Sequence, residues 1–212
     1  MKRFFTRKDV HIDLSHRCPM QCPRCQRQMW FTGKHGDKVW GNDLPMRTIE
    51  MLVDKFEHLS FSGQLSDPIH YPKFIEVLKL CNEKKRRVLV QTASSFKPIS
   101  WFKKAFEAYP QAIWRFGLDG LPEESHKYRI NQDGKKIFQV MLEGKKILKN
   151  APAWQYIVFK YNEHHQLQAK RMAEEHGLNF VIMKSSRWLP KGDPYMPSSE
   201  KNRLGTVYAE DV

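Results

Sequence analysis

Three cysteines close together are the part of the sequence most able to do chemistry. Cys18, Cys22 and Cys25 follow the spacing C-x3-C-x2-C, which lets thiolates on one loop surround a compact metal centre. A structural zinc site needs four closed ligands, and a ferredoxin cluster needs four cysteines. Three thiolates on a four-iron cluster would leave one iron open to a substrate or a cofactor. The spacing therefore favours an open iron–sulfur site.

A different class of protein remains open on the same residues. His16 or His11 could complete a zinc knuckle, and such a module would bind nucleic acid without catalysis. The net charge of +13, from 36 basic and 23 acidic residues, agrees with that reading but does not establish it. Charge alone governs solubility and non-specific attraction. The fourth cysteine, Cys81, lies on the apolar face of an expected helix, so we predict that it belongs to the core.

Length and composition narrow the setting of this cysteine group. The chain has 212 residues, of which 41% are hydrophobic and 28% charged, as expected for a globular protein with one large domain. No apolar run reaches the length of a membrane span, and no apolar segment follows the basic N-terminus as it would in a secretory signal. Four cysteines are too few for a disulfide scaffold. We therefore expect a cytoplasmic protein with no membrane partner.

The elements that must position the cysteines alternate between strand and helix. Apolar patterns predict strands at 11–14, 58–62, 88–91, 113–118, 155–159 and 179–183. They predict helices that begin near Thr48, after Pro72, at Ser100, at about Lys136 and at Asn162, the last of them stopped by Gly177. This order predicts an α/β fold with a parallel sheet and right-handed crossovers. About six such units are too few for a complete barrel, so we expect a partial (βα)6 TIM-like barrel with ligands at the carboxyl ends of its strands.

The composition changes near the C-terminus. We assign residues 1–184 to one core domain and 185–212 to an extended tail, because prolines, glycine and serines become frequent there. Trp188, Tyr195 and Tyr208 predict that the tail packs back on the core, over the open side of the sheet. In the loop after the cysteines, Trp30, Phe31 and Trp40 either recognise a ligand or keep water from the metal centre.

Motifs spread along the chain resemble one known family. C-x3-C-x2-C follows the first expected strand, Ser62-Gly63-Gln64 ends the second, and Phe116-Gly117-Leu118-Asp119-Gly120 is followed by Tyr128-Arg129. Together these motifs resemble the radical S-adenosylmethionine (SAM) superfamily, and in particular the core domain of its SPASM and twitch peptide-modifying branch. The resemblance covers roughly residues 8–184.

The resemblance implies a cofactor set and a residue set. Cys18, Cys22 and Cys25 would bind three irons of a [4Fe–4S] cluster, and SAM would occupy the fourth iron. The implied SAM contacts are Ser62, Gly63 and Gln64 at the methionine ammonium, Arg129 at the carboxylate, Thr92, Ser94 and Gly117 near the ribose, and Arg24 against the adenine. No residue is assigned as catalytic.

The sequence departs from the family pattern at several of these positions. Arg24 precedes the last cysteine, where an aromatic residue is common, and Gln64 replaces the usual Glu. Gly117 stands where the related branch often has Ser. No cysteine follows Cys81, so the resemblance implies a single cluster without auxiliary ones.

The function implied by the resemblance is reductive cleavage of SAM to methionine and a 5′-deoxyadenosyl radical, which abstracts hydrogen from a substrate. The branch implies a peptide or protein substrate and a reducing electron donor such as flavodoxin or ferredoxin. Two other enzyme classes remain as alternatives: a glycyl-radical-activating enzyme and an enzyme that modifies RNA or nucleotides.

Overall fold

The strands of the molecule form one parallel sheet. The computed structural model describes residues 8–28, 41–189 and 192–204. Within them the strands lie in the order β1-β2-β3-β4-β5-β6, and every neighbouring pair is parallel. The strands are β1 (Asp9–His11), β2 (His58–Phe61), β3 (Arg87–Thr92), β4 (Ile113–Gly117), β5 (Ala153–Ile157) and β6 (Asn179–Met183). The chain thus has the open α/β sheet that the sequence predicted.

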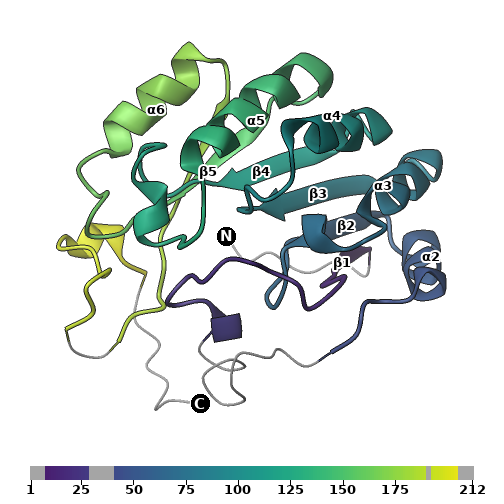
Figure 1. The fold of residues 1–212 in the computed structure, drawn as a ribbon, viewed down its shortest axis with the longest axis horizontal. Helices are drawn as coiled ribbons and strands as arrows, with labels where there is room; N and C mark the ends of the chain where they lie inside the picture. The colour runs from purple at the N-terminus through teal and green to yellow at the C-terminus, as the bar shows by residue number, and fades with distance from the viewer. Residues whose placement is uncertain (1–7, 29–40, 190–191, 205–212) are drawn as a thin grey trace.

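Helices cover one face of this sheet (Figure 1). The helices are α2 (Met46–Lys55), α3 (Phe74–Glu83), α4 (Ile99–Ala108), α5 (Gly134–Ile147) and α6 (Gln166–Glu175), with short 3-10 turns at Pro68–His70, Ser125–Lys127 and Glu200–Asn202. The cysteine segment and the C-terminal tail lie on the other side (Figure 1). None of the helices described is long and apolar enough to cross a membrane.

The hydrophobic core lies between the sheet and its helices. On β4 and β5 the helix-facing positions hold Trp114, Phe116, Trp154 and Tyr156, all with no exposed surface. The Phe106 ring of α4 meets Trp114 edge to face, with ring centroids 5.0 Å apart. Each such aromatic side chain removes a large apolar area from water, so the burial of this layer stabilises the fold.

Proline decides where two of the helices begin. We predicted starts near Thr48 and at Ser100, but α2 begins directly after Pro45 and α4 directly after Pro98. Both prolines have extended ψ angles and a φ near −65°, the value that the ring imposes and that suits the chain entering a helix. Thr48 and Ser100 therefore lie inside the first turn.

Other boundaries also differ from the prediction, most of them by one or two residues. β1 covers 9–11 rather than 11–14, and β5 covers 153–157 rather than 155–159. α6 begins at Gln166 rather than Asn162, because the buried Asn162 side chain binds the backbone of Phe159 and Ile157 and so holds a turn. The C-terminal end is confirmed, since Gly177 follows the helix with φ +64°.

The tail lies against the cysteine segment. Asp193 accepts hydrogen bonds from the backbone amides of Leu189 and Tyr195 and forms an ion pair of 2.8 Å with Arg24. Trp188 is buried in a cluster with Cys22, and Tyr195 meets the ring of Tyr128 edge to face. Of the other aromatic residues singled out in the sequence, Trp30, Phe31, Trp40 and Tyr208 lie outside the described residues.

Candidate functional site

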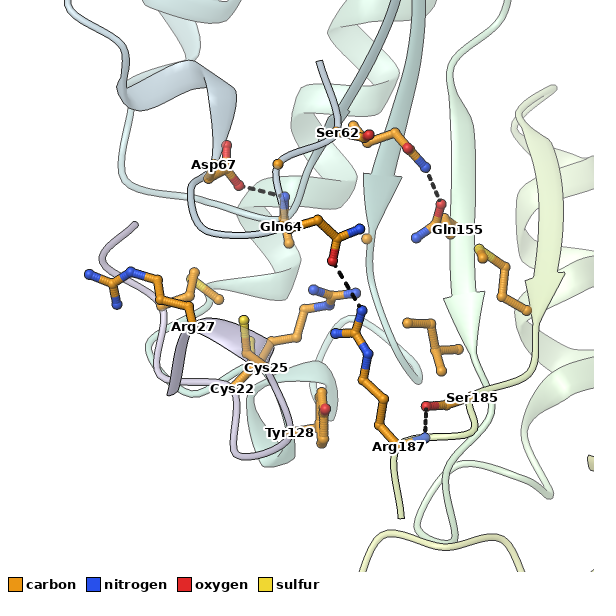
Figure 2. A pocket seen from close by; sticks show the side chains of 18 of the residues that line it. Cys22, Cys25, Arg27, Ser62, Gln64, Asp67, Tyr128, Gln155, Ser185 and Arg187 are labelled. Atoms are coloured by element: carbon orange, nitrogen blue, oxygen red, sulfur yellow. Dashed lines mark hydrogen bonds between the residues drawn. The ribbon is translucent and has the colours of Figure 1, made fainter. Parts of the chain in front are cut away.

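A cavity of about 420 Å³ opens on the face of the sheet that the helices leave free. Its lining comes from the cysteine loop, from the carboxyl ends of β2 to β6 and from the start of the tail (Figure 2). Most of the residues predicted for the site meet here: Cys18, Cys22, Cys25, Ser62, Gly63, Gln64, Thr92, Gly117 and Arg129. Arg24 and Ser94 are not among its lining residues.

The cysteine loop forms one wall of this cavity. Cys22 is buried, Cys18 and Cys25 are half-buried, and the amide of Cys25 donates to the carbonyl of Cys22 at 3.0 Å. Burial raises the pKa of the Cys18 thiol to about 12 and that of the Cys22 thiol to about 11. Both thiols are therefore protonated at neutral pH in the metal-free protein, and a metal centre must displace their protons to bind.

The three thiols line one cavity, while the described residues include no preformed site for a single metal ion. In the described part of the chain, no three His, Cys, Asp or Glu side chains converge closely enough to hold one ion. That finding gives no support to a zinc knuckle completed by His16 or His11, because zinc draws four ligands to one point. A four-iron cluster spreads its thiolates over separate irons. Three thiols facing one cavity satisfy that looser requirement.

The turn after β2 owes its shape to Asp13. The carboxylate of Asp13 accepts from the backbone amides of Gln64, Leu65 and Ser66 at 2.9–3.2 Å and from the Ser66 hydroxyl at 2.9 Å. Gly63 has φ +30°, and a Cβ at this position would lie 2.0 Å from the Ser66 carbonyl oxygen. Only glycine permits this turn, which brings Ser62 and Gln64 to the cavity (Figure 2).

A second carboxylate organises the end of β3 in the same way. Asp67 is buried and accepts hydrogen bonds from the Thr92 hydroxyl and from the amides of Ala93 and Ser94. Ser94 is fully buried, and its hydroxyl lies 2.7 Å from Nε2 of His70. The structure thus places Thr92 at the cavity and Ser94 behind it.

Arg129 reaches the cavity over a glycine. Its Nε lies 2.7 Å from Oδ2 of Asp119, and the two side chains are 13% and 0% exposed. Burial raises the pKa of the Asp119 carboxyl, and the positive charge of Arg129 opposes that rise. A Cβ on Gly117 would lie 2.7 Å from Nη2 of Arg129. Gly117 therefore makes room for the guanidinium.

Two other residues singled out in the sequence do not line the cavity. Arg24 pairs with Asp193 of the tail, and its side chain is 17% exposed. Cys81 is fully buried in α3, which confirms its place in the core.

Sequence reasoning missed several residues that shape or line the cavity. Asp13 was assigned only to the strand expected at 11–14, Arg115 only to the strand expected at 113–118, and Arg187 only to the tail. The signal for Arg115 is the alternation in Trp114-Arg115-Phe116, because a charge between two aromatics in a strand must face away from the core. No local pattern marks Asp13 or Arg187, whose partners are 51 and 123 residues away.

Comparisons with known proteins bear on the fold. No family model matches the sequence, and no curated protein matches it significantly. Among solved structures, methylornithine synthase (PylB) matches with a TM-score of 0.65 and 14% identity over 91% of this chain. Streptococcus suis SuiB bound to its precursor peptide SuiA matches with a TM-score of 0.67 and 13% identity over 82% of this chain. SuiB bound to S-adenosylmethionine gives a TM-score of 0.64 and 14% identity over 82% of this chain.

These likenesses define the class of fold. The chain has the radical SAM core fold, as the motifs predicted, with six parallel strands in one open sheet. At such low identity the likeness extends to the fold alone. The chain spans 58% of the length of methylornithine synthase and 38% of SuiB in its peptide complex.

Proposed function

We propose that the chain is a radical SAM enzyme that acts on a peptide or protein. One observation carries the proposal: three thiols, the turn at Gly63 and the Arg129 guanidinium, all expected from the motifs, line a single cavity. SAM-bound and peptide-bound SuiB share the fold, which supports both the cofactor and the substrate class. In this proposal Cys18, Cys22 and Cys25 hold a [4Fe–4S] cluster.

When bound, the reduced cluster supplies the electron that cleaves SAM to methionine and a 5′-deoxyadenosyl radical, the species that abstracts hydrogen from the substrate. The contribution of this chain is to hold SAM in register and to exclude water. Met20, Tyr128, Phe159 and Trp188 are buried around the cysteine loop and provide a dry surround for it. Tyr128 and Phe159 stack with centroids 4.0 Å apart.

The turn at Gly63 is suited to an ammonium group. Its amides at Gln64, Leu65 and Ser66 already donate to Asp13, which leaves the Ser62 hydroxyl and the Gln64 side chain, both with an acceptor oxygen, to meet a ligand. An ammonium has three N–H donors and needs such acceptors. We assign the Ser62 hydroxyl and the Gln64 side-chain oxygen to the methionine ammonium, with Gln64 contributing no charge.

Arg129 is suited to a carboxylate. A guanidinium has five N–H donors, and the contact with Asp119 involves Nε. The Nη groups remain for the carboxylate of SAM, while Thr92 and Gly117 lie beside the expected ribose position. Ser94 would support the Thr92 side of the ribose site from behind. Arg24 would stack on the adenine while its Nε keeps the ion pair with Asp193.

Iron–sulfur ligation by thiolates implies a reducing compartment, and we assign the chain to the cytoplasm on that ground. A flavodoxin or ferredoxin would supply the electron.

The test is reconstitution under anaerobic conditions with iron and sulfide, followed by SAM and dithionite, with 5′-deoxyadenosine measured by mass spectrometry. We expect 5′-deoxyadenosine from the wild type and none from Cys22→Ala. Cys81→Ala is the matched control, because Cys81 is buried in α3 away from the cavity and should leave iron content and product unchanged.

Loss of iron from both variants alike would contradict the assignment of the three thiols. A protein that takes up zinc but no iron would support the nucleic-acid-binding module instead.

A further inference from the structure

Four cations that line the cavity have no role in the SAM contacts assigned above: Arg27 in the cysteine loop, and three from β4 and the segment after β6. Arg115 lies in β4, Lys184 directly follows β6, and Arg187 lies three residues further along the tail. We propose that these three side chains, the cation set, hold a negatively charged oxygen group of the substrate, a carboxylate or a phosphate. The identification of that ligand as a substrate rests on the proposed function; the existence of the anion site does not.

Arg115 is the centre of the argument. It is half-buried, and its side chain makes no hydrogen bond or ion pair with the described residues. An arginine side chain that lines a cavity can pair with an anion that enters it, because charge-assisted hydrogen bonds to a guanidinium are strong. A guanidinium that faces a cavity without a protein anion is therefore matched to an anion from outside the chain.

The cavity offers no free negative charge to the cation set. Among the described residues that line it, Asp67 is the single carboxylate, and its oxygens are taken by Thr92 and by the amides of Ala93 and Ser94. Lys184 is exposed and has no partner in the described structure. The local potential of this wall is thus positive, which attracts an anionic ligand.

Arg115 lies apart from the predicted SAM contacts. Those contacts sit at the ends of the strands, whereas Arg115 is two residues nearer the amino end of β4 than Gly117. In the sheet, Arg115 is level with Gln91 of β3. The Gln91 amide donates to the Gln155 oxygen at 2.8 Å across β4, and the amide nitrogen of Gln155 is left to donate to a ligand (Figure 2).

Arg187 lies between the cation set and the turn at Gly63 to which the SAM ammonium is assigned. Its guanidinium contacts the side-chain oxygen of Gln64 at 3.3 Å (Figure 2). This partner is neutral, so the charge of Arg187 remains uncompensated. A substrate anion between Arg115 and Arg187 would therefore lie beside the turn assigned to the SAM ammonium, where the reacting groups must meet.

The test measures anion binding by calorimetry on the anaerobically reconstituted full chain at low salt, with inorganic phosphate in one arm and succinate in the other. Arg115→Gln removes the charge and leaves a side chain like its neighbours Gln91 and Gln155. Arg115→Lys keeps the charge, and Arg171→Gln removes an exposed arginine from the outer helix α6 as a matched control.

We expect Arg115→Gln to weaken anion binding at least tenfold, Arg115→Lys to restore most of it, and Arg171→Gln to leave it unchanged. Binding of phosphate alone assigns a phosphate, and binding of succinate alone assigns a carboxylate; both support the site. Absence of binding in both arms overturns it, as does an equal loss in Arg171→Gln.

A parallel titration with SAM separates the two proposals. If Arg115→Gln weakens SAM binding as much as anion binding, the cation set serves the SAM carboxylate and the substrate assignment is wrong. If the wild type binds anions through Arg115 but forms no 5′-deoxyadenosine, the anion site stands and the proposed function fails.

Discussion

The two faces of the sheet are built from alternating residues of the same strands, yet they differ in burial and in polarity. On β4, Trp114 and Phe116 point into the helix-covered core, while Arg115 and Gly117 between and after them line the cavity. On β5, Trp154 and Tyr156 alternate with Gln155 in the same way. One face stabilises the fold, and the other is left polar for a ligand.

This contrast indicates that the residues of the cavity face contribute little to the free energy of unfolding, so the residues of the core face must provide most of it. Polar side chains on the cavity face, such as Arg115, gain little from folding unless a ligand meets them. Stability and function are therefore separable by substitution at neighbouring positions in one strand.

The largest expected effect comes from the core face. Trp114→Ala should lower the free energy of unfolding by about 3–5 kcal/mol, whereas Gln155→Ala on the cavity face should cost about 1 kcal/mol, the worth of its hydrogen bond to Gln91. Urea denaturation measures both. Trp114→Phe should cost much less, because it also removes a buried ring N–H with no partner among the described residues. Equal losses at Trp114 and Gln155 would erase the contrast.

Asp13 tests whether the cavity face has a rigid part of its own. Asp13→Asn replaces a charged acceptor of four hydrogen bonds, so we expect a loss of about 1.5–3 kcal/mol together with weaker SAM binding. Asp43→Asn, which removes an ion pair with the half-exposed Arg17, is the control and should change little. If Asp13→Asn and Asp43→Asn had the same unfolding free energy and the same SAM affinity, the turn would not depend on Asp13.

Gly117 tests how tightly the side chains of the cavity face pack against one another. Gly117→Ala places a Cβ against the Arg129 guanidinium, and we expect a loss of about 1–3 kcal/mol in unfolding free energy. Because the contact is with the end of the Arg129 side chain, Arg129→Lys in the same chain should recover part of the loss. A double-mutant cycle measures that coupling, and simple additivity would contradict the contact.

The smallest effect lies far from both faces, on the helix surface. The hydrogen bond from Lys103 of α4 holds the pKa of Glu143 in α5 at about 2, below its ordinary value of 4.5. A lowered pKa stabilises the folded state above the ordinary pKa, and this contribution is lost as the pH falls toward 2. Glu143→Gln should lower Tm by no more than about 2 °C at pH 7, and the difference should vanish near pH 2. Calorimetry over that range decides; a constant difference would exclude the ion pair as its cause.

The core face was predictable from the sequence, because apolar periodicity records burial directly. The aromatic strand around Trp114 and the helix stop at Gly177 both appear as expected. The starts of α2 and α4 were not predicted, since Pro45 and Pro98 outweigh the capping preference of Thr48 and Ser100.

The cavity face was predictable where a local pattern or the family resemblance marks a residue, as it does for Thr92, Gly117 and Arg129. The spacing of Cys18, Cys22 and Cys25 and the Ser62-Gly63-Gln64 turn are local patterns, and all six line the cavity. The contacts of Arg24 and Asp13 join distant parts of the chain. No periodicity encodes such pairs, so the partner of a charged residue had to come from the structure.

The ion pair between Arg24 and Asp193 also has a consequence for biosynthesis. Its two residues are 169 positions apart, with the cysteine loop at one end and the tail at the other. A ribosome releases the loop first and the tail last, so this contact forms only when nearly the whole sheet has emerged. Until the tail has emerged, the thiols of the loop lack the cover that Asp193 and its neighbours give and remain accessible to solvent.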